Sequence, residues 1–114
     1  MPDYAAAIEF SATDFPGPEF RMLRRQLVPL LQASEGVTGV RTDRASHVIG
    51  AVVVVAAPSS STAVARAGAL ARGLLPRLRK VRTARIRLRV ELKRDERARG
   101  VREGDSRPLI EANT

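Results

Sequence analysis

The sequence predicts an α+β protein of the ferredoxin-like type, with the element order strand–helix–strand–strand–helix–strand (βαββαβ). Apolar residues recur at helical spacing in two segments, and four other segments carry strand signals, the last of which alternates strictly. The expected architecture is a four-stranded antiparallel sheet with two helices on one face. Right-handed crossovers would place the first and third strands at its centre, with the fourth at an edge beside the first. We expect residues 1–94 to form this single α+β domain and residues 95–114 to form a charged C-terminal extension or tail.

The first half of the chain supplies a strand, a helix and a short second strand. Residues 4–12 predict a strand with Tyr4, Ile8 and Phe10 on one face and Ala5, Ala7 and Glu9 on the other. The loop at 13–18 contains two prolines and a glycine and leads into a helix over about 18–34. The apolar stripe of that helix comprises Phe20, Leu23, Leu27, Leu30 and Leu31. Gly36 ends the helix, and residues 37–42 form a short strand.

The second half supplies the central strand, a second helix and the edge strand. Residues 47–57 are apolar and β-branched at consecutive positions, which is typical of a strand covered on both faces. After Pro58, the Ser59–Thr62 run offers N-caps for a helix that runs to about Lys80. Its apolar side comprises Val64, Ala67, Leu70, Ala71, Leu74, Leu75 and Leu78. Pro29 and Pro76 both fall inside the predicted helices, so we expect each helix to bend there.

Residues 84–93 carry the clearest strand signal in the chain. Their alternation directs four aliphatic side chains inward and four charged ones outward. The inward set is Ile86, Leu88, Val90 and Leu92, and the outward set is Arg85, Arg87, Arg89 and Glu91.

Charge is distributed unevenly along the chain, whose formal net charge is +8. Residues 1–65 carry five basic and six acidic side chains, whereas residues 66–114 carry 15 basic and six acidic ones. A field of this kind attracts acidic protein surfaces, polyanions or anionic headgroups, although it also fits a merely solvated basic face. The candidate partner- or anion-binding residues are Arg77, Arg79, Lys80, Arg85, Arg87 and Arg89.

Composition argues against an enzyme, a metal site and a bound cofactor. There is no cysteine and only one histidine, which removes thiolate chemistry and most imidazole metal sites. His47 and Ser59 bracket one strand, so they would lie roughly 40 Å apart at about 3.3 Å per residue, too far for a catalytic pair. The SSST run is better interpreted as a helix cap than as a phosphate site, and no Walker A string exists. We therefore expect no catalytic, cofactor-binding or metal-binding residue.

The same sequence features bear on location and partners. No apolar run reaches the roughly 18–20 residues of a membrane span, and the first residues do not resemble a signal peptide, so we expect a cytoplasmic protein without a membrane partner. The third strand holds no aromatic residue, which argues against base stacking of the RNA-recognition type. The predicted sheet leaves one face open, with valines beside arginines. We therefore expect a homodimer or a heteromer through that face.

Several segments together resemble a known family. An apolar strand (GAVVVVAA) meets a small-residue turn (PSSST), followed by a helix ending in basic residues (ALARGLLPRLRK) and an alternating strand (ARIRLRVEL); FRMLRRQLVPLLQ lies upstream. This plan is similar to the effector-associated constant component domains of bacterial conflict systems. The resemblance implies a non-enzymatic accessory module that binds a protein partner, such as an effector or regulatory component. The alternative is a non-specific nucleic-acid or phosphate binder that uses the arginine-rich second half.

Overall fold

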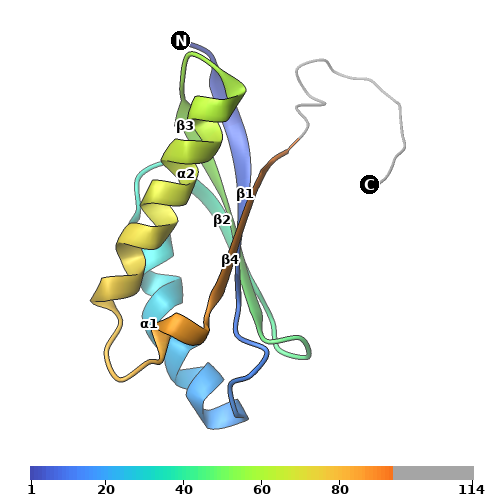
Figure 1. Ribbon diagram of the computed structural model, residues 1–114, viewed down its shortest axis with the longest axis vertical. Helices are drawn as coiled ribbons and strands as arrows, with labels where there is room; N and C mark the ends of the chain where they lie inside the picture. Colours follow the sequence, from blue (N-terminus) through green and yellow to red (C-terminus); the bar gives the residue numbers. More distant parts are fainter. Residues whose placement is uncertain (94–114) are drawn as a thin grey trace.

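The computed structural model describes residues 1–93, which form a four-stranded antiparallel sheet with two helices packed on one face (Figure 1). The strands are β1 (Asp3–Ser11), β2 (Val37–Asp43), β3 (Val48–Ala56) and β4 (Arg87–Leu92), and the helices are α1 (Gly17–Ala33) and α2 (Ser60–Leu74). The strand order β2-β3-β1-β4 confirms the predicted βαββαβ arrangement, including the central first and third strands. The extension predicted at residues 95–114 lies outside the described residues.

The core lies between the sheet and the helices. Ile8 and Phe10 of β1 and Ile49 of β3 are fully buried there, on the face predicted for Ile8 and Phe10. From α1, the buried side chains are Phe20, Leu23, Leu27 and Leu31, which confirms most of the predicted stripe. Each such side chain contributes roughly 1.5–3 kcal/mol when it leaves water, so this layer is the main source of stability.

Helix α2 lies against β1 and β4 through small side chains. Its buried residues are Ala63, Ala67, Gly68, Ala71 and Leu74, whereas Val64 and Leu70 of the predicted stripe are only half-buried. Small side chains leave little bulk between the helix and the sheet, so the larger ones occupy the flanks. The N-cap prediction is confirmed, because the Ser59 hydroxyl accepts the Thr62 N–H at 3.3 Å.

The predicted end of the second helix is wrong. Helix α2 stops at Leu74, and Leu75–Arg77 form a 3₁₀ turn that contains Pro76. Pro76 lacks the N–H that would continue the helical ladder, and the Leu75 N–H instead bonds the Arg72 carbonyl. Pro29 does lie inside α1, as predicted.

The predicted start of the last strand is also wrong. Thr83–Arg85 form a second 3₁₀ turn, and β4 begins only at Arg87, which pairs with Ser11 at the end of β1. Beyond Ser11 the chain leaves the sheet, and the Ala12 N–H bonds the His47 carbonyl at 2.9 Å. Arg85 therefore has no strand beside it, although the alternating sequence continues through it.

Candidate interaction face

One face of the sheet carries no helix among residues 1–93, and we call it the open face (Figure 1). Strand pairing determines which residues lie on it, because directly opposed residues point to the same side. From β1 and β4 these are Asp3, Ala5, Ala7, Glu9, Ser11, Arg87, Arg89 and Glu91. From β2 and β3 they are Gly39, Arg41, Asp43, Val48, Gly50, Val52, Val54 and Ala56. The open face is thus a mixture of small apolar and charged side chains.

The middle of the open face is apolar and shallowly hollowed. Ala7 lies opposite Val52, and Ala5 lies opposite Val54, whose side chain is 39% exposed. A depression of about 370 Å³ extends from Ala7 and Val52 toward Gly39 and Gly50, and the charged residues Glu9, Arg41 and Lys93 also line it. The small residues lower this part of the surface, so a protruding apolar side chain of a partner would fit there.

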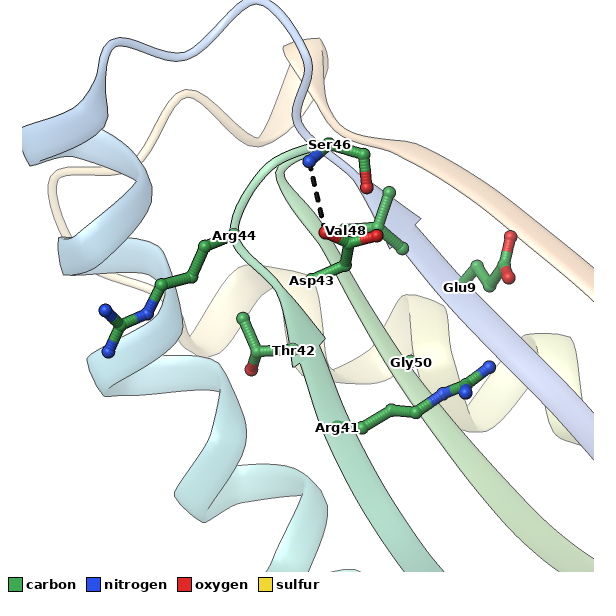
Figure 2. Close-up of a pocket in the computed structure, with 8 residues that line it drawn as sticks. All are labelled: Glu9, Arg41, Thr42, Asp43, Arg44, Ser46, Val48 and Gly50. Carbon is green, nitrogen blue, oxygen red and sulfur yellow. Dashed lines mark hydrogen bonds between the residues drawn. The ribbon is translucent and has the colours of Figure 1, made fainter.

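A charged row crosses the same face. Arg89 lies opposite Glu9, Glu9 lies opposite Gly50, and Gly50 lies opposite Arg41. The Arg41 chain crosses Gly50, with its Nε 3.9 Å from the place where a Cβ on Gly50 would sit, and Figure 2 shows it directed toward Glu9. Arg89 also pairs with Glu91 at 3.2 Å. Along this row, Glu9 therefore has Arg89 on one side and, beyond Gly50, Arg41 on the other.

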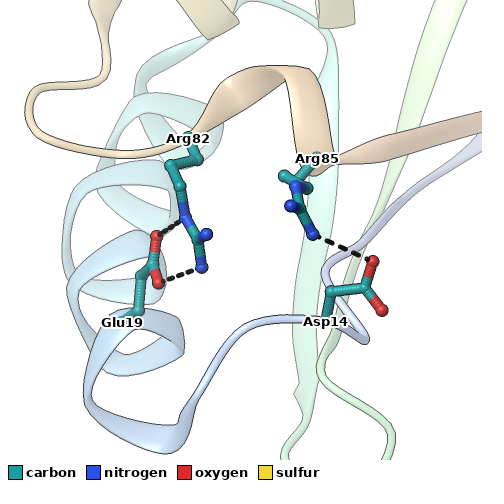
Figure 3. Close-up of polar contacts among 4 residues, drawn as sticks. All are labelled: Asp14, Glu19, Arg82 and Arg85. Atoms are coloured by element: carbon teal, nitrogen blue, oxygen red, sulfur yellow. Dashed lines mark hydrogen bonds and ion pairs between the residues drawn. The ribbon is translucent and has the colours of Figure 1, made fainter.

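The structure separates the six predicted binding residues into three places. Arg87 and Arg89 lie on the open face. Arg85 lies in the turn before β4, where its guanidinium is 3.6 Å from the Asp14 carboxylate (Figure 3). The remaining three, Arg77, Arg79 and Lys80, lie in the connection from α2 to β4.

That connection is attached to α1 through its backbone. The Gln26 side chain accepts the Arg79 N–H at 2.7 Å and donates to the Arg79 carbonyl at 2.8 Å. Arg77, Arg79 and Lys80 therefore belong to the helical layer, so the six residues do not form one continuous surface.

Arg82, which the sequence did not single out, makes the strongest ion pair among the described residues. Its guanidinium donates two hydrogen bonds to Glu19, at 2.7 and 2.8 Å (Figure 3). The hydrogen bonds from Arg82 lower the pKa of the Glu19 carboxyl, and those to Glu19 raise the pKa of Arg82. The pair joins α1 to the segment before β4, so its role is structural.

Sequence reasoning missed Arg41, because β2 is a weak strand signal in a half of the chain with slightly negative net charge. The available signal was Gly50, since a glycine within an otherwise β-branched run often marks the close approach of another group.

The described residues hold no group of three or more potential metal ligands among His, Cys, Asp and Glu. The one histidine lies before the start of β3 and Ser59 lies beyond its end, so they cannot act together. Within residues 1–93, neither helix has both the length and the apolarity to cross a membrane.

Comparisons with known proteins return no matching family, no matching curated protein and no matching solved structure.

Proposed function

We propose that this protein is a non-enzymatic, cytoplasmic interaction module that binds an acidic protein partner through the open face. The resemblance to effector-associated constant component domains supports a role as an accessory component of a bacterial conflict or signalling system. In that role the partner is an effector or regulatory protein of the same system.

The observation that carries the proposal is a sheet with an apolar middle on the face that no helix of residues 1–93 covers. Val54 is 39% exposed, whereas the large aliphatic side chains on the other face of β3 are in the core. An apolar centre within a charged rim is the usual anatomy of a protein interface. Burial of Ala5, Ala7, Val52 and Val54 would supply its apolar part.

Charge favours an acidic partner over a second copy of the chain. The formal net charge is +8, so two copies repel each other at long range, whereas an acidic protein is attracted. Arg41 and Arg89 border the apolar middle at one end, Lys93 borders it beside Ala5, and Arg87 lies further along β4. These four cations outnumber Glu9 and Glu91 among them and offer donors to carboxylates. Nucleic acid is less favoured, because the open face offers no aromatic side chain on which bases could stack.

Amine-specific crosslinking tests the proposal, because the chain has only two lysines. Lys93 lines the depression on the open face, whereas Lys80 lies in the connection from α2 to β4. A partner isolated from the native host and purified should crosslink through Lys93 and not through the exposed Lys80. Val54→Glu on the open face should abolish the crosslink, and the matched control Ala69→Glu, on the exposed side of α2, should preserve it.

Three results would contradict the proposal. The first is a partner that crosslinks through Lys80 and is unaffected by Val54→Glu. The second is a stable homodimer at micromolar concentration that Val54→Glu dissociates, which would assign the open face to a second copy. The third is nucleic-acid binding that weakens with salt at a log–log slope near −0.9 per phosphate contact and is lost in Arg87→Gln/Arg89→Gln.

A further inference from the structure

A basic pocket lies away from the open face, between the start of α1 and the turn that joins β2 to β3. It is lined by Gly17, Phe20, Arg21, Arg24, Arg44 and His47, with a cavity volume of about 210 Å³. No acidic residue lines it. These arginines come from the half of the chain whose net charge is slightly negative, so composition gave no sign of the cluster.

The β2–β3 turn is built to present two of these side chains. The Asp43 carboxylate accepts the Ala45 N–H at 3.0 Å and the Ser46 N–H at 3.3 Å, which fixes the turn. Figure 2 shows the second of these hydrogen bonds. In Figure 2 the Arg44 side chain leaves this turn toward α1. His47 closes the turn in a left-handed conformation, with φ at 56°. Such a conformation is uncommon for a residue with a side chain and concentrates at functional positions.

His47 is held in place through its ring and through its backbone. It stacks on the Phe20 ring with centroids 4.4 Å apart and an interplanar angle of 6°. Its backbone carbonyl accepts the Ala12 N–H at 2.9 Å. Because Phe20 is buried in the core, the imidazole is a positioned group of the pocket wall and not a loose surface side chain.

Within the described part of the chain, the three guanidinium groups have no counter-ion. Among residues 1–93, none of Arg21, Arg24 and Arg44 forms an ion pair. Arg21 folds back toward the start of α1, with its Nη1 3.7 Å from the place where a Cβ on Gly17 would sit. No side chain caps this end of the helix, and its first residue, Gly17, lines the pocket.

We propose that this pocket binds a phosphate group carrying two negative charges, either as free phosphate or as a phosphomonoester. Guanidinium groups match phosphate oxygens in geometry and charge, and a dianion relieves the repulsion among three of them. The cavity is smaller than the roughly 300–1,000 Å³ of pockets that enclose drug-sized ligands. The pocket therefore takes the phosphate group itself, with any organic remainder in solvent. This inference is independent of the partner proposed for the open face.

The single histidine provides a direct reporter for the experiment, because its ring signals in a ¹H–¹³C NMR spectrum belong to His47 alone. The full chain is titrated with inorganic phosphate at constant ionic strength maintained with chloride. In separate arms, ribose 5-phosphate tests a monoester, acetate tests a carboxylate and a short single-stranded DNA tests diesters. We expect saturable shifts of the His47 ring signals with phosphate, with the monoester or with both, and these two arms distinguish the sources. Acetate and DNA should give no saturable shift.

Substitutions locate the binding site. Arg24→Gln and Arg44→Gln should each weaken phosphate binding about tenfold, because each removes a charge-assisted hydrogen bond. Arg25→Gln is the matched control, since Arg25 is the neighbour of Arg24 on α1 but does not line the pocket. Equal weakening by Arg25→Gln, a response to DNA alone, or no saturable shift with either phosphate compound would each overturn the proposal. A far-ultraviolet circular dichroism spectrum confirms that each variant is folded.

Discussion

Single residues in left-handed conformations mark the sharpest turns of this fold. Three occur among the described residues: Gly36 with φ at 87°, His47 at 56° and Lys80 at 58°. The prediction that Gly36 ends the first helix is wrong, because α1 ends at Ala33 with Ser34 as its C-cap. Gly36 instead lies directly before β2, and its carbonyl accepts the Val54 N–H at 2.8 Å. At this position both the backbone conformation and the available space require a glycine.

Gly36→Ala should lower the free energy of unfolding by about 2 kcal/mol or more. A Cβ at this position would lie 2.7 Å from the Val54 carbonyl oxygen, a backbone atom that cannot move aside cheaply. Gly39→Ala is the matched control, because a Cβ there meets nothing within 4 Å. The control should change stability by less than about 1 kcal/mol in urea unfolding. Equal losses in the two variants would contradict this account.

The Glu19–Arg82 pair predicts a specific dependence of stability on pH. The folded-state pKa of Glu19 lies below the ordinary value of 4.5, mainly through the hydrogen bond from Arg82. The unfolded state therefore binds a proton first as the pH falls. The stabilisation is complete above pH 4.5 and is lost as the pH falls through the folded pKa. Glu19→Gln should unfold more readily at neutral pH and show a flatter decline in stability below 4.5.

Urea unfolding over that pH range measures the effect of Glu19→Gln. Glu35→Gln is the control, because Glu35 is exposed and forms no ion pair within residues 1–93. Its pH profile should run parallel to that of the wild type. A Glu19→Gln profile that also runs parallel would show that the pair does not contribute to folding.

At the element scale, most of the fold could be predicted from periodicity. The alternation in β1 and β4 and the stripe of α1 predicted the buried faces correctly, because each element buries one side against the same core. The ends of α2 and β4 could not be predicted, since they depend on distant residues. The last strand was predicted to include Arg85, but it begins at Arg87, because its neighbour β1 ends at Ser11. No local sequence pattern near Arg85 reveals where β1 ends.

Pro29 and Pro76 show the same limit of prediction from local sequence. Their local strings, LVPLL and LLPRL, look alike, yet one lies within a helix and the other ends one. What differs is tertiary: Leu31 after Pro29 reaches the core as a helical residue, whereas Leu78 after Pro76 reaches it in an extended conformation.

Pro29→Ala should raise the free energy of unfolding by roughly 1–3 kcal/mol, because proline inside a helix costs about 3 kcal/mol relative to alanine and the structure has accommodated part of that cost. Pro29 is exposed, so little packing is lost. Pro76→Ala should change the free energy of unfolding by less than about 1 kcal/mol. An N–H at residue 76 would bond the Arg72 carbonyl in a helix, but that carbonyl already accepts the Leu75 N–H. Thermal or urea unfolding of both variants measures the difference. Equal stabilisation by the two alanines would mean that Pro76 also interrupts a helix.

At the scale of the whole molecule, the two faces of the sheet differ in character. Its helix-covered face holds the core, and its open face holds Arg87, Arg89 and the apolar middle. Sequence predicted this division and the positions of Arg87 and Arg89. It could not predict the approach of Arg41 to Glu9 across Gly50, or the pocket formed by Arg21, Arg24, Arg44 and His47. Both arise from the pairing of segments that are far apart in the chain.

Alternate residues of β4 should therefore respond oppositely to substitution. Arg87→Gln/Arg89→Gln should leave the free energy of unfolding within roughly 1 kcal/mol of the wild type, because both side chains are exposed. Leu88→Ala should lower it by about 2 kcal/mol, the lower end of the range for leucine, because Leu88 lies opposite the buried Phe10 but is itself only half-buried.

Partner binding should be weakened by Arg87→Gln/Arg89→Gln and unaffected by Leu88→Ala, the reverse of their effects on stability. The double arginine variant should bind the partner that crosslinks through Lys93 severalfold more weakly, with a slower association rate and a smaller dependence on salt, because rim charges act mainly on encounter. Leu88→Ala should bind that partner as the wild type does under conditions where it is folded, since its side chain points to the core. Chemical denaturation and surface plasmon resonance of the same two variants give both comparisons. An arginine variant that unfolds the protein, beside a Leu88→Ala variant that only weakens binding, would mean that the open face and the core face are interchanged.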